Sequence, residues 1–120
     1  MAFCCWRSLR KNEWFELPLN VGLKYCNRPN QVDPHVPGPM AFKDQDRVNN
    51  IISASGFTNV SIKDHKSKLV VGPTPKMAAN NSIGVGPLSW ILQNFDNHIK
   101  ALVQTELEKQ LMQNVTSQGV

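Results

Sequence analysis

Ala2-Phe3-Cys4-Cys5-Trp6-Arg7, close to the N-terminus, is an unbroken apolar run that ends at a basic residue. An apolar run without polar alternation is typical of a strand that is buried on both faces, as in a parallel sheet. Such a strand needs a neighbour on each side, and only Met1 precedes it. The sequence therefore predicts an α/β fold in which elements that should flank this strand are missing.

A helix followed by a strand is predicted in the middle of the chain. Asp44 is a good N-cap, and Gly56 is placed to end the helix in the left-handed conformation. The residues on one face of this helix are Val48, Ile51, Ile52 and Ser55. Val60 and Ile62 then alternate with polar residues, which predicts a half-buried strand.

A second helix is predicted near the C-terminus, with Asp96 as its cap. Its apolar residues recur at three- and four-residue spacing: Ile99, Leu102, Val103, Leu107 and Leu111. Before it, a turn at Gly72–Pro75 leads into a segment interpreted as polar, and Gly84–Pro87 leads into an apolar stretch at residues 88–92.

Residues 15–25 are ambiguous, because their apolar residues alternate as in a strand while Pro18 fits the first turn of a helix. Periodicity leaves both alternatives open. The following stretch, Asn27–Gly38, is rich in proline and predicts a long irregular loop, which we expect to be mobile. Loops of this length are often binding loops or lids.

The amino-acid composition limits the class of protein to which the chain can belong. The chain has 120 residues, of which 41% are hydrophobic and 18% charged, as in a soluble globular domain. The net charge is +4, but the basic residues are not interleaved with aromatic ones, so no nucleic acid is predicted as a partner. No apolar run approaches the ~18 residues of a membrane span, so no membrane is predicted either. The three cysteines match neither a disulfide framework nor a zinc site, and no secretory leader is present, which predicts a cytoplasmic protein.

Several short strings occur in an order and spacing that point to one family. They are Phe3-Cys4-Cys5-Trp6-Arg7, Asn12-Glu13-Trp14, residues 33–42 (DPHVPGPMAF), Asp46-Arg47-Val48, Ser55-Gly56-Phe57, residues 83–88 (IGVGPL) and residues 115–120 (VTSQGV). Together they resemble a group of bacterial class I S-adenosylmethionine-dependent methyltransferases. The resemblance covers nearly the whole chain.

This resemblance implies the C-terminal part of a doubly wound, Rossmann-like sheet with an inserted helical lid. Residues 1–120 would form a partial domain containing the fifth strand, the lid, a helix, the sixth strand and C-terminal helices, with a helix at Leu17–Tyr25. The family binds S-adenosylmethionine through a Gly-rich turn and an acidic residue that this chain lacks. The resemblance therefore implies S-adenosylmethionine for the intact family and no cofactor for this chain alone.

The predicted function is a methyltransferase fragment that is inactive by itself. The residues placed near an acceptor pocket are Trp6, Arg7, Trp14, His35 and Phe42. Trp14 and Phe42 would be apolar walls and Arg7 or His35 polar contacts, although a structural role, with Trp6 and Phe42 in the core, fits equally. No catalytic, cofactor-binding or metal-binding residue is predicted.

The alternative function is a non-catalytic interaction module, or one half of a split methyltransferase. As a partner we expect either a separate N-terminal half or a second copy, joined through the exposed edge of the predicted strand.

Overall fold

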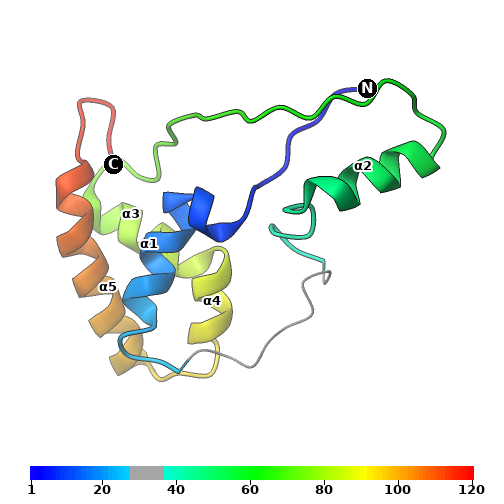
Figure 1. The fold of residues 1–120 in the computed structure, drawn as a ribbon. Helices are drawn as coiled ribbons and strands as arrows, with labels where there is room; N and C mark the ends of the chain where they lie inside the picture. Colours follow the sequence, from blue (N-terminus) through cyan, green and yellow to red (C-terminus); the bar gives the residue numbers. More distant parts are fainter. Residues whose placement is uncertain (28–36) are drawn as a thin grey trace. The chain divides into compact units, whose positions relative to one another are not determined.

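The computed structural model describes residues 1–27 and 37–120, and in this part of the chain it is helical (Figure 1). The elements are η1 (Leu9–Lys11), α1 (Glu13–Gly22), α2 (Gln45–Ala54), α3 (Pro75–Gly84), α4 (Pro87–Leu92), α5 (Asn97–Leu111) and η2 (Met112–Asn114). The chain divides into two compact units. Among the described residues, unit 1 contains 1–12 and 37–68, and unit 2 contains 13–27 and 69–120.

The predicted α/β fold is wrong. Within residues 1–27 and 37–120 there is no sheet, and the single β-bridge joins Thr116 to Gly119 across a tight turn. Residues 1–6 are all exposed, and the predicted strand at Val60–Ile62 has no ladder partner in the part of the chain that the structure describes. An apolar run predicts a buried strand only if other elements supply the surfaces that cover it, and the sequence pattern carries no information about those surfaces.

Unit 2 is a helical assembly in which α1, α3, α4 and α5 pack around a hydrophobic core (Figure 1). The buried residues of this core are Val21, Cys26, Ala78, Ala79, Leu88, Ile91, Leu92, Val103, Leu107, Leu111 and Val120. Each of these four α-helices contributes to this list, so the core is built from all of them.

The α1 helix resolves the ambiguity at residues 15–25 in favour of a helix. It runs over Glu13–Gly22, so it begins and ends earlier than the helix predicted over Leu17–Tyr25. Glu13 and Glu16 stand in its first turn, where carboxylates are favoured by the helix dipole. Pro18 lies inside the helix and is buried, which shows that packing of its ring offsets the hydrogen bond that it cannot donate.

The α3 helix was missed, because its segment was interpreted as polar. Thr74 is its N-cap, with a side chain that accepts a hydrogen bond from the Met77 amide, and Pro75 stands in the first turn. Its buried residues are small: Ala78, Ala79 and Ser82. Small side chains let α3 pack closely against α5, but they produce almost no hydrophobic periodicity.

The C-terminal residues are held against the segment that precedes α3. The Val71 amide donates to the Val120 carbonyl at 2.6 Å, and the Val120 amide donates to the Gly72 carbonyl at 2.9 Å. Gly119 has φ of +125°, a conformation that glycine adopts without strain. These two hydrogen bonds fix residues 71–72 at the edge of the unit 2 core.

The α2 helix in unit 1 has the predicted ends. Asp44 accepts hydrogen bonds from the amides of Asp46 and Arg47, and Gly56 has φ of +88°. The predicted buried face is only partly present, however. Val48 is buried, whereas Ile51 is 41% exposed.

The cap of α5 gives a first testable prediction. The Asp96 carboxylate accepts from the Ile99 amide at 2.9 Å. We expect Asp96→Ala to lower the free energy of unfolding by about 1 kcal/mol, because the amide loses its acceptor at the start of a core helix. Urea denaturation followed by circular dichroism measures the change. Asp96→Asn, which keeps an acceptor oxygen, should stay within a few tenths of wild type, and equal losses in both variants would contradict the role of this hydrogen bond.

Candidate interaction surface

The structure divides the predicted pocket residues between the two units. Trp6, Arg7 and Phe42 belong to unit 1, whereas Trp14 belongs to unit 2. The Trp14 ring lies 5.8 Å from the Phe15 ring, centroid to centroid, at the start of α1. His35 lies outside the described residues.

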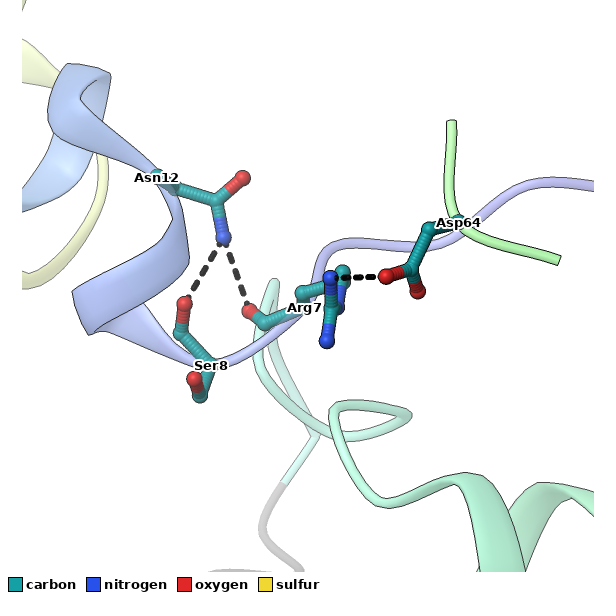
Figure 2. Close-up of polar contacts among 4 residues, drawn as sticks. All are labelled: Arg7, Ser8, Asn12 and Asp64. Carbon is teal, nitrogen blue, oxygen red and sulfur yellow. Dashed lines mark hydrogen bonds and ion pairs between the residues drawn. The ribbon is translucent and has the colours of Figure 1, made fainter. Parts of the chain in front are cut away.

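Arg7 connects the N-terminal segment to the segment that follows α2. Its Nη1 atom lies 2.6 Å from Asp64 Oδ2, and both side chains are partly exposed (Figure 2). Asn12 Nδ2 donates to the carbonyl oxygens of Arg7 and Ser8, each at 2.9 Å (Figure 2). An ion pair this exposed contributes about 0–1 kcal/mol, so its main effect is to neutralise the Asp64 carboxylate.

Phe42 lies next to the same N-terminal segment. Its carbonyl oxygen accepts a weak hydrogen bond from Cys5 Sγ at 3.5 Å. The Phe42 ring is 44% exposed and Trp6 is 37% exposed, so the interpretation of these two residues as core is wrong. They contribute apolar surface to the exterior of unit 1.

The cysteines differ in their surroundings. Cys4 and Cys5 are exposed, whereas Cys26 is buried in the core of unit 2. Burial raises the pKa of the Cys26 thiol, because an apolar environment disfavours the thiolate. The described residues contain no group of three or more His, Cys, Asp or Glu side chains that could hold a metal ion. Nor does this part of the chain contain a helix long and apolar enough to cross a membrane.

Residues 60–70 form an extended segment with no regular structure (Figure 1). Every residue from 61 to 70 is exposed. Within the described part of the chain, the backbone of this segment makes a single hydrogen bond, from Ser67 Oγ to the Lys68 carbonyl. The remaining amide and carbonyl groups are therefore available to a partner.

Charge is distributed unequally between the two units. The described residues of unit 1 contain eight Lys and Arg residues against three Asp, a net charge of +5. Those of unit 2 contain four Lys against five Asp and Glu, a net charge of −1. Within the extended segment, the charged side chains are Lys63, Asp64, Lys66 and Lys68.

The two units also differ in how many hydrophobic side chains they bury. Val48 is the one buried hydrophobic residue among those described in unit 1. The large apolar side chains that this unit exposes are Met1, Phe3, Trp6, Phe42, Ile51, Phe57 and Ile62, each at least 37% exposed. Val60 and Ile62 were predicted to form a half-buried strand, and the lysines around them were not predicted to bind a nucleic acid. The spacing of residues in the sequence did not indicate that these lysines and the exposed apolar side chains belong to the same unit.

Comparison of the chain with family models, with curated proteins and with solved structures finds no match. The predicted methyltransferase membership is therefore wrong, since no family model supports it and the described fold has no Rossmann-like sheet. The matching strings are short, and their order alone does not establish common structure. The expectation of S-adenosylmethionine as the cofactor of the intact family rested on that resemblance alone.

Proposed function

We propose that this chain is a non-catalytic protein-interaction module, in which unit 2 is the stable scaffold and unit 1 binds the partner. The observation that carries the proposal is the contrast in burial between the units. Unit 2 encloses a core drawn from four helices, whereas the described residues of unit 1 bury one hydrophobic side chain, Val48.

Exposed apolar surface on this scale favours association. Removing apolar area from water stabilises a complex by about 25 cal/mol per Å². Contiguous exposed apolar surface therefore commonly marks a site of interaction with another molecule. Exposed apolar side chains of unit 1 occur on the N-terminal segment (Phe3), on α2 (Ile51) and on the extended segment (Ile62). A partner that covers them would supply the packing that the unit lacks.

The proposal is tested by selecting random peptides displayed on phage against the immobilised full chain. We expect selected peptides to bind in calorimetry, and Phe57→Ser with Ile62→Ser to weaken binding by about tenfold or more, because these side chains are 46% and 42% exposed in unit 1.

The matched control replaces exposed apolar residues of unit 2. Met77→Ser with Trp90→Ser removes side chains that are 51% and 46% exposed, and it should leave peptide affinity unchanged. Circular dichroism should show the same helix content in both double variants. Selection that yields no binding peptide, or peptides that lose affinity only in the unit 2 variant, would refute the proposal.

A further inference from the structure

We infer that the partner of unit 1 is an acidic peptide segment that pairs with residues 60–68 of the extended segment as an added β-strand. This inference rests on the proposed function and specifies its partner. Three properties of the extended segment support it: its unpaired backbone, its charge and its residue pattern.

The backbone of the extended segment is ready for strand pairing. Its amides donate no hydrogen bond within the described residues, and its carbonyls accept only the one from Ser67 Oγ. An exposed extended chain with free donors and acceptors can form a ladder with a second extended peptide. The pattern of Val60, Ser61, Ile62 and Lys63 also suits a strand, because its apolar residues alternate with polar ones.

The positive charge of the extended segment favours an acidic partner. Lys63, Lys66 and Lys68 are exposed, and none of them makes an ion pair within the described residues. The one acidic residue of the segment, Asp64, is neutralised by Arg7 at 2.6 Å. Carboxylates on a paired strand would therefore meet uncompensated positive charge, which favours encounter and binding.

The same charges disfavour a second copy of unit 1 as the partner. Two such units would each bring a net charge of +5 over their described residues, and like charges in an interface cost binding energy. A single-stranded nucleic acid would satisfy the lysines. Its bases carry donors and acceptors, but these do not repeat at the spacing of the amides and carbonyls of an extended peptide, as a paired strand would.

Residue placement determines which peptide makes a suitable probe. Successive side chains of a strand point to opposite faces, so in a paired strand Lys63 would lie on one face and Lys66 and Lys68 on the other. A capped peptide with the repeat Glu-Glu-Val-Val places both carboxylates and apolar side chains on both of its faces. It can therefore complement either face in a ladder.

The experiment measures binding of this Glu-Glu-Val-Val peptide to the full chain by calorimetry. We expect measurable affinity at low salt that falls as salt is added, since the lysines are exposed. Lys63→Glu with Lys66→Glu should weaken binding by about tenfold or more. The same peptide with all its amides N-methylated should also lose affinity, because neither of its edges can then donate to the ladder.

Two proline variants locate the ladder within the chain itself. The amides of strand residues an odd number apart point to opposite edges, so Ser61→Pro and Asp64→Pro remove donors from opposite edges. We expect one of them to abolish binding and the other to serve as its control. Both residues are exposed and outside the core of unit 2, so the helix content should not change.

Equal affinity for the N-methylated peptide, equal affinity for a Lys-Lys-Val-Val peptide, or no effect of either proline variant would overturn the inference. So would tighter binding of a single-stranded oligothymidine at the same surface. These results are distinguishable from failure of the proposed function. If selected peptides require Phe57 and Ile62 but are not acidic, the interaction module stands and the strand-addition inference fails. If no peptide binds at all, both fail.

Discussion

Leu107→Ala is expected to lower the free energy of unfolding by about 2–5 kcal/mol, the range for large-to-small changes in a packed core. Leu107 has no exposed surface, and it lies on α5, which packs against α3 in unit 2. Removing its branched end leaves a cavity that the closely packed small residues of α3 cannot fill without a backbone shift. Urea denaturation followed by the helical circular dichroism signal measures the loss.

The matched control is Leu102→Ala on the same helix. Leu102 is 38% exposed, so the same change of residue should cost less than about 1 kcal/mol. Both variants have the same effect on helix propensity, which isolates the packing contribution of Leu107. Comparable losses for the two variants would show that the packing of unit 2 differs from the arrangement described here.

Gly72→Ala is the second change with a large expected effect. A Cβ atom at position 72 would lie 2.6 Å from the Ala78 amide nitrogen and 2.9 Å from its Cα. These are backbone atoms at the start of a core helix, so they cannot move aside as a flexible side chain would. The Gly72 carbonyl also accepts the Val120 amide, and displacement of residue 72 would weaken that hydrogen bond. We expect a loss of about 1–3 kcal/mol or more in unfolding free energy.

Gly84→Ala is expected to raise the unfolding free energy in the same experiment, whereas Gly72→Ala lowers it. Gly84 is the last residue of α3, and an added Cβ would meet no atom within 4 Å. Alanine there should stabilise the chain by about 0.5–1 kcal/mol, because it reduces the conformational freedom of the unfolded chain. If Gly72→Ala were as harmless as Gly84→Ala, the close approach of residue 72 to α3 would be disproved.

The candidate site was only partly accessible to prediction. Arg7 was predicted as a polar pocket contact, and the structure instead pairs it with Asp64, 57 residues away. Phe42 was predicted as an apolar wall, and its ring lies on the exterior of unit 1. The basic segment around Lys63 was visible in the sequence, but its exposed and unpaired backbone was not. Whether a backbone segment stays unpaired depends on whether distant segments of the chain pack against it. A local sequence pattern contains no information about that packing.

Helix ends were determined by the sequence itself. Asp44, Gly56 and Asp96 act where they were predicted to act, because a cap is formed by a side chain and amides only two or three residues away, or by the backbone freedom of one glycine. The donor and acceptor of each cap lie within a single helical turn, so a short stretch of sequence contains every residue that forms it.

Only the tertiary structure decided what is buried. The apolar run Ala2–Trp6 is exposed, whereas Ala78 and Ala79 of a segment interpreted as polar are fully buried. Burial depends on surfaces supplied by residues distant in the chain: α3 is covered by α5, and the N-terminal run has no sheet to join among the described residues. Hydrophobicity determines which side chains gain by leaving water, but the packing of distant elements determines which of them actually do.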